Sequence, residues 1–215
     1  MTIVNTEATT THIRRQPAQD RSALRFELIL DTMAGLIDEV GYSSITISLI
    51  AKRSSMSGPA VYRYFDDVQS ISRELATRNL NRYIERAAAV IADNGLEWPD
   101  TMLSALEAFC EMHRVEPGFR WLRLGDGIDR NLISTTDTNH RMLSRLLADL
   151  FIKRYGDWNR PNLLKHIETV VEIAEALIAK AFESDADGDT FFIGEARRVI
   201  VMYLDEYVSR APEDA

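Results

Sequence analysis

The sequence predicts an all-α protein with about nine helices, in which a small three-helix domain precedes a C-terminal helical bundle. Apolar residues recur at three- and four-residue steps along most of the 215-residue chain, a spacing typical of amphipathic helices. No segment alternates apolar and polar residues as a strand does, and only six prolines interrupt the helical pattern. The composition, 46% hydrophobic and 27% charged, is that of a globular chain long enough to bury its own core.

The first three helices are predicted from their apolar spacing and their end residues. The first helix ends before Gly41, which suits the left-handed position that follows many helices. Thr46 can cap a short second helix and Ser57 a short third one, because both side chains carry an oxygen that accepts from backbone N–H groups. Residues 54–56 form the tight turn between them. Over about residues 46–65 this arrangement is a helix-turn-helix.

Later helices are predicted over about 68–92, 99–114, 117–124 (more weakly), 163–182 and 191–208, whereas 126–139 are polar and irregular. The last two helices are apolar on two sides. A single core covers one side, so a second copy of the chain is expected to cover the other. The residues expected at this dimer interface are Leu163, Ile167, Val170, Ala174, Leu177, Ala196, Val199 and Tyr203.

Charge is unevenly distributed along the chain. The net charge is −8, yet residues 12–65 carry seven basic and five acidic residues. The N-terminal part is therefore the part suited to approach a polyanion. A single cysteine, Cys110, excludes an internal disulfide, and the N-terminus lacks the pattern of a secretory signal. With apolar runs too short for a membrane span, a cytoplasmic location is expected.

Several residues at fixed spacing carry a family resemblance. They are Ile29-Leu30, Gly41-Tyr42, Thr46, Ile50-Ala51 and the run Ser-Gly-Pro-Ala-Val-Tyr-Arg-Tyr-Phe at 57–65. Over about residues 23–83 the chain resembles the TetR/AcrR family of bacterial transcriptional regulators. The resemblance implies a flexible N-terminal arm at 1–21, a DNA-binding domain at 22–84 and a ligand-binding and dimerisation domain at 85–215.

The function implied by the resemblance is a ligand-responsive repressor that a small apolar effector releases from operator DNA. Its partners would be double-stranded DNA, a second copy of itself and the effector, with no cofactor and no catalytic residue. The alternatives are an all-helical enzyme or cofactor carrier with its site in the bundle, and a protein-interaction adaptor. Neither a nucleophile–base pair nor a metal-ligand spacing supports the enzyme alternative.

The expected DNA-binding residues are Thr46, Lys52, Ser57, Gly58, Ala60, Tyr62, Arg63 and Tyr64. Small residues at the start of the third helix let its backbone amides approach phosphates, and tyrosine hydroxyls can bond to phosphate oxygens. Arg63 can contact a phosphate or a guanine edge. Val61 and Phe65 are expected to point into the core. Arg14 and Arg15 fit either a minor-groove arm or an ordinary solvated terminus.

Two departures from the family pattern stand out. The turn lacks the usual glycine, so a non-glycine residue is expected to hold the strained turn conformation. A lysine that usually contacts the DNA backbone is replaced by Val68, which follows Asp66 and Asp67. One phosphate contact is therefore lost, and weaker non-specific DNA affinity is expected.

An apolar, aromatic-rich set of residues fits either a packed core or an effector pocket between helices. The set comprises Met102, Phe109, Met112, His113, Phe119, Trp121 and Met142. No metal site is expected: the histidines lack the Glu-x-x-His spacing of bundle metal sites, and the acidic run at 185–189 lacks the glycine and glutamate of a calcium loop.

Overall fold

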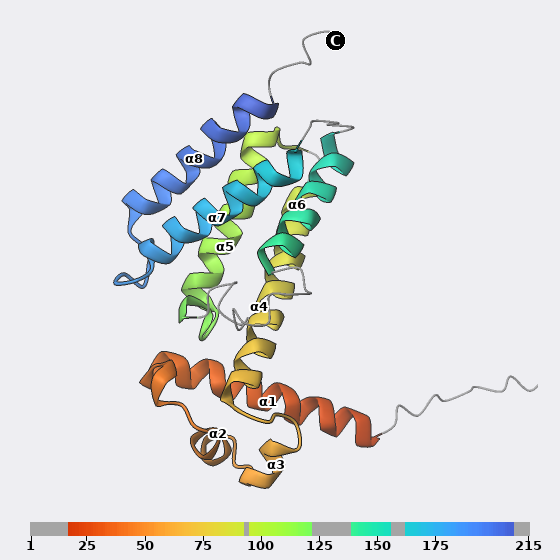
Figure 1. Ribbon diagram of the computed structural model, residues 1–215, viewed down its shortest axis with the longest axis vertical. Coiled ribbons are helices and arrows are strands. Elements are labelled where there is room, and N and C mark those ends of the chain that lie inside the picture. The colour runs from red at the N-terminus through yellow and green to blue at the C-terminus, as the bar shows by residue number, and fades with distance from the viewer. Residues whose placement is uncertain (1–16, 93–94, 122–138, 156–161, 209–215) are drawn as a thin grey trace, which may run out of the picture.

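The computed structural model describes residues 17–92, 95–121, 139–155 and 162–208, and these contain helices, turns and loops without strands (Figure 1). The α-helices are α1 (Pro17–Val40), α2 (Ile47–Arg53), α3 (Gly58–Tyr62), α4 (Val68–Ile91), α5 (Trp98–Val115), α6 (Asn139–Tyr155), α7 (Leu163–Ala181) and α8 (Thr190–Val208). Two short 3-10 helices, η1 (Tyr42–Ser44) and η2 (Phe119–Trp121), follow α1 and α5. Arg14 and Arg15 lie outside the described residues.

The predicted all-helical class is confirmed, with two differences in detail. The weak helical pattern at 117–124 gives the 3-10 turn η2 within the described residues. No helix bounds were predicted for residues 139–155, which form α6. Its large buried side chains, Leu143, Leu147 and Phe151, follow one another at four-residue steps and lie in one row along the helix.

The small N-terminal core is built by α1, α2, α3 and the first turns of α4. The side chains buried completely in it include Ile29, Met33, Ile37, Ile50, Val61, Ile71 and Leu75. Phe26 stacks on Phe65 with ring centroids 5.0 Å apart. These contacts fix the two short helices, which at seven and five residues are too short to be stable alone.

The larger core lies among the second half of α4 and helices α5 to α8. In Figure 1, α7 and α8 run side by side at one edge of this bundle, and α6 lies on the other side of α7. None of the helices in the described residues is long and apolar enough to cross a membrane.

Helix α4 takes part in both cores. Leu75 belongs to the small core and Leu80, five residues later, to the large one. Its 24 residues contain neither glycine nor proline, so no residue favours a kink. Asp67 starts the helix in a capping box, in which its side chain accepts from the Ser70 N–H at 2.6 Å. One continuous helix therefore joins the two parts.

Candidate nucleic-acid interface and cavity

The turn between α2 and α3 adopts the strained conformation that the sequence analysis expected. Ser55 has a φ of 56°, in the left-handed region. The buried Ser54 hydroxyl donates to the Ile50 carbonyl at 2.8 Å, and the Met56 N–H donates to the Ala51 carbonyl at 2.9 Å. These bonds close the end of α2 and set the direction in which α3 leaves.

The two predicted caps behave differently. Thr46 caps α2, since its hydroxyl accepts from the Leu49 N–H at 3.1 Å. Ser57 occupies the same position before α3, but its hydroxyl accepts no bond from the helix. Pro59 has no N–H to offer, and the Ala60 N–H already donates to the Ser57 carbonyl at 2.9 Å. The exposed Ser57 hydroxyl is thus available to an external partner.

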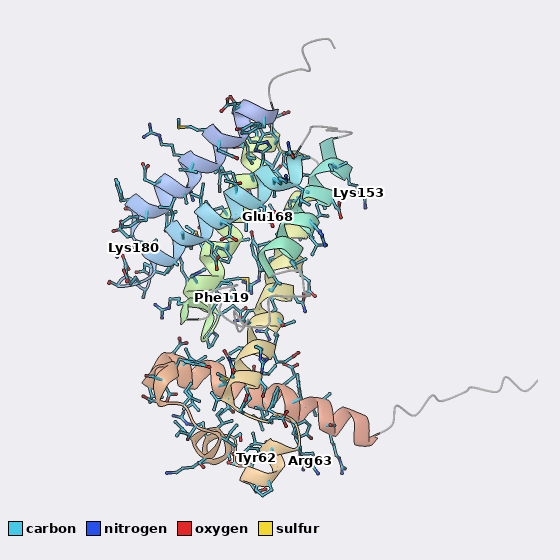
Figure 2. The ribbon with its side chains drawn as sticks, viewed as in Figure 1. Tyr62, Arg63, Phe119, Lys153, Glu168 and Lys180 are labelled. Atoms are coloured by element: carbon cyan, nitrogen blue, oxygen red, sulfur yellow. The ribbon has the colours of Figure 1, made fainter. Side chains whose placement is uncertain are left out.

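Helix α3 divides into an inner and an outer face. Val61 and Phe65 are buried, as predicted, while Tyr62 is 57% exposed and Arg63 is exposed. Figure 2 places Tyr62 and Arg63 at the end of the molecule farthest from α8. A Cβ added at Gly58 would meet no atom within 4 Å, so nothing in the chain's own packing requires a glycine there.

Ser22 and Arg25, near the start of α1, also lie at this surface, and neither was among the DNA-binding residues expected from the sequence. The Ser22 hydroxyl donates to the Tyr64 hydroxyl at 3.4 Å. This hydrogen bond lowers the pKa of the Tyr64 phenol, and the Arg63 and Arg25 cations act in the same direction. The contact of Phe26 with Phe65 brings this part of α1 to α3. Phe26 stands at helical spacing with the buried Ile29 and Met33, and this spacing is the sequence signal that places it on the inner side of α1.

The remaining charged residues of this region have mixed surroundings. Lys52 is exposed near the end of α2, whereas the neighbouring Arg53 is paired with Glu39 of α1. The Asp67 side chain caps the start of α4, and Val68 is half-buried against the small core. The replacement of a lysine by Val68 is therefore compatible with the fold.

A cavity of about 40 Å³ lies inside the large core. It is lined by Tyr83, Met102, Ala105, Leu106, Phe109, Leu143, Leu147, Val170, Val171, Ala174, Glu175 and Ile200, from all five helices of the bundle. Of the expected pocket residues, Met102 and Phe109 line it. Met112, His113 and Phe119 are buried in the surrounding core instead, and the side chains of Trp121 and Met142 lie outside the described residues.

The polar groups near the cavity are few and deeply buried. The Tyr83 hydroxyl donates to the Ala105 carbonyl at 3.3 Å, and burial raises the pKa of its phenol. Glu175 is 4% exposed. His113 donates from Nδ1 to the Phe109 carbonyl at 2.9 Å, and burial lowers the pKa of its imidazole to about 4. His113 is therefore neutral at pH 7.

The residues expected at a dimer interface fall into two groups. Leu163, Ile167, Val170, Ala174 and Ala196 are buried in the chain's own core, and two of them, Val170 and Ala174, line the cavity. Leu177, Val199 and Tyr203 are half-buried. Within the chain, α6 and α8 pack against α7 from two sides (Figure 1). Across the described ranges, no group of three possible metal ligands occurs.

A helix-turn-helix with tyrosine and arginine side chains on its outer face, joined to a helical bundle, defines a DNA-binding regulator. Residues 29–75 match the family described as bacterial regulatory proteins, tetR family. Residues 96–208 match the tetracyclin repressor-like C-terminal domain. The chain belongs to the TetR family of DNA-binding transcriptional regulators, whose members are transcription factors and not enzymes.

Similar proteins support the same assignment. A TetR-family transcriptional regulator from Streptomyces coelicolor is 30% identical, with a TM-score of 0.71, over 86% of this chain and 99% of that one. A TetR-family regulator from Pectobacterium atrosepticum shares the fold at 17% identity and a TM-score of 0.67, over 91% and 99% of the two chains. The uncharacterized HTH-type regulator YobS of Bacillus subtilis is 24% identical over 129 residues, which are 60% of this chain and 66% of YobS.

Proposed function

We propose that the protein is a homodimeric repressor that binds operator DNA through α3 and is released by a small apolar effector. The main support for this proposal is the outer face of α3. Its exposed Tyr62 and Arg63, the uncapped Ser57 hydroxyl and a glycine that the chain's own packing does not need suit a helix lying against phosphates. Arg25 and Ser22 beside Tyr64 extend the same surface.

A dimer is supported by apolar side chains of α7 and α8 that the chain itself leaves partly uncovered. Leu177, Val199 and Tyr203 are half-buried, and Met202 is 62% exposed. Covering these side chains with the same pair of a second copy would remove apolar surface from water. In such a dimer the two copies of α3 must lie about 34–36 Å apart to reach successive major grooves.

The cavity is the proposed effector site. It draws its walls from α4 to α8 and is predominantly apolar, with Glu175 and Tyr83 as polar groups. At about 40 Å³ it holds a few water molecules at most. An effector larger than that must displace the walls, so its binding favours a different arrangement of the bundle.

Selection of bound fragments from the source genome tests this function. Purified protein should recover a palindromic site, and sedimentation should show a dimer at micromolar concentration. Replacing both Tyr62 and Tyr64 by Phe deletes two hydroxyls and keeps the rings, so affinity for that site should fall while the melting temperature stays constant. Recovery of no preferred fragment, or unchanged affinity in the folded double variant, contradicts the assignment.

A further inference from the structure

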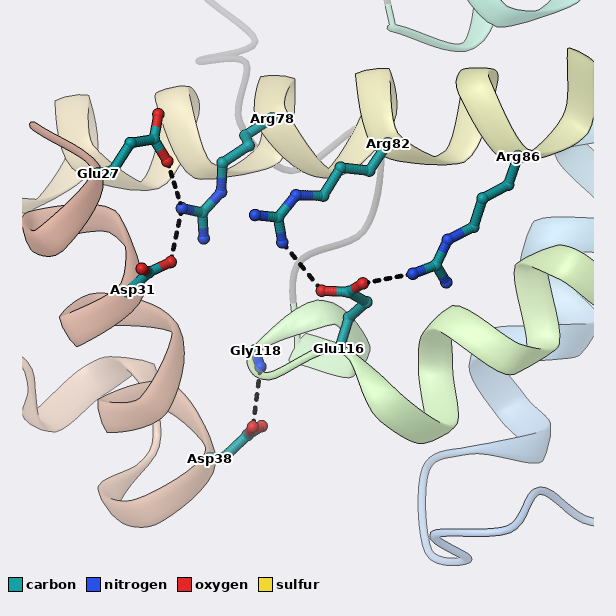
Figure 3. Close-up of polar contacts among 8 residues, drawn as sticks. All are labelled: Glu27, Asp31, Asp38, Arg78, Arg82, Arg86, Glu116 and Gly118. Carbon is teal, nitrogen blue, oxygen red and sulfur yellow. Dashed lines mark hydrogen bonds and ion pairs between the residues drawn. The ribbon is translucent and has the colours of Figure 1, made fainter. Parts of the chain in front are cut away.

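The turn that follows α5 is wedged against α1. The Gly118 N–H donates to the Asp38 carboxylate at 2.8 Å, across 80 residues of sequence (Figure 3). Gly118 has a φ of 71°, and a Cβ there would lie 2.9 Å from the Ala34 Cα. Only a glycine lets the turn approach the α1 backbone this closely.

The same turn is fixed to α4 by two arginines. Both oxygens of the Glu116 carboxylate are occupied, one by Arg82 at 2.9 Å and the other by Arg86 at 2.6 Å. The Glu116 side chain is 16% exposed, so these ion pairs are less screened by solvent than ordinary surface pairs. Arg78, one turn earlier on α4, bridges Glu27 and Asp31 of α1. The arginine row thus holds α1 and the end of α5 along one face of α4.

The turn also reaches back to the cavity. The Glu116 N–H donates to the Met112 carbonyl at 3.0 Å, which continues the hydrogen bonding of α5 into the turn. Phe119 packs edge-on against Phe109 at 5.6 Å and against His113 at 4.8 Å. Phe109 lines the cavity. A contiguous set of packed groups therefore runs from the cavity wall to the backbone of α1.

We propose that the turn at 116–119 transmits the state of the cavity to the DNA-binding domain through α1, by a route separate from the continuous helix α4. The proposal rests on the function proposed above. When Phe109 moves, Phe119 moves with it, and Gly118 bears directly on Ala34 and Asp38. Because Ile37 on the same turn of α1 is buried in the small core, a displacement of α1 there moves α2 and α3 as well. Because effector binding and operator binding oppose each other, operator binding must in turn stabilise the effector-free arrangement of α5 around the cavity.

This reciprocity gives a test that needs operator DNA and no effector. Hydrogen exchange is measured by mass spectrometry on the full chain, with and without the fragment selected above. In the wild type, operator should slow exchange at α5 residues 102–112 by at least about 5-fold, the lower end of typical allosteric coupling. In Asp38→Ala the slowing at α5 should vanish, while the slowing in α2 and α3 persists and shows that DNA is bound.

Two further variants sharpen the result. Glu39→Ala is the matched control: it removes the neighbouring carboxylate, which pairs with Arg53 inside the DNA-binding domain, and should keep the wild-type response. Phe119→Leu interrupts the route at its other end and should reproduce the effect of Asp38→Ala. It therefore provides the test if the Asp38→Ala protein does not fold. Undiminished α5 slowing in a folded route variant overturns the inference, as does wild-type protein that binds DNA without any α5 slowing.

If the proposed function is wrong, no DNA fragment binds the wild type. The inference is then tested by hydrogen exchange measured without DNA. Asp38→Ala should then speed exchange in α5 beyond the turn itself, and a change confined to residues 116–119 would overturn the inference.

Discussion

Replacing Arg63 by Ala tests how the second helix of the motif meets DNA. The residue is exposed at the C-terminal end of α3, beside the exposed Tyr62. If each Arg63 neutralises one phosphate, its loss removes about 0.9 from the slope of log affinity against log salt, or about 1.8 for two protomers. Between about 50 and 200 mM salt, a fourfold change, the advantage of wild type over variant should therefore shrink about 12-fold.

Fluorescence anisotropy with a labelled operator, repeated at several salt concentrations, measures these slopes. Lys153→Ala is the matched control, because it also removes one exposed cation but lies on α6 at the other end of the molecule (Figure 2). Its slope should equal that of the wild type. An unchanged slope for Arg63→Ala together with relaxed preference at one base pair would place Arg63 on a guanine edge instead. An unchanged slope with unchanged sequence preference refutes the reasoning.

Four further outcomes are expected from single substitutions. Tyr62→Phe should weaken operator binding by about 1–3 kcal/mol if the hydroxyl bonds to a phosphate, and equal anisotropy curves would contradict that contact. Val199→Arg should give folded monomers in sedimentation, since Val199 is only half-buried and does not line the cavity, whereas Ala174→Arg should unfold the chain because Ala174 lines the cavity. Folded, dimeric protein from either substitution would count against its assignment. When the pH is lowered from 7 to 5, the free energy of unfolding should fall by about 2 kcal/mol less in His113→Gln than in the wild type. The unfolded histidine takes up a proton below about pH 6.5, whereas burial keeps the pKa of the folded one at about 4, so the wild type loses stability as the pH is lowered. Urea unfolding at the two pH values measures this difference. Parallel pH curves would contradict this.

The local features of the DNA-binding domain were predictable from the sequence because they depend on near neighbours. The inward positions of Val61 and Phe65 follow from helical spacing, and the cap at Thr46 from its side chain. The positive φ of Ser55 follows from the tight turn between two short helices, which contains no glycine. Each follows from the spacing and type of residues within the helix-turn-helix itself.

The cavity and the apolar faces of α7 were harder to assign because they depend on which helices meet. Met102 and Met112 both lie on the apolar side of α5, but Met102 lines the cavity and Met112 packs in the core around it. Helical spacing does not separate these two surroundings. Likewise, the contact of Gly118 with Asp38 joins residues 80 apart, and nothing in the local sequence of either residue indicates the other.

The continuity of α4 makes the angle between the two halves of the protein a function of residue count. One residue inserted between Leu75 and Leu80 would lengthen the helix by about 1.5 Å and turn the DNA-binding domain by about 100° relative to the bundle. Seven inserted residues would restore the direction to within about 20°, at the cost of about 10 Å in length. A chimera that joins this DNA-binding domain to the bundle of a relative must therefore preserve the number of residues between these two leucines, whatever their identities.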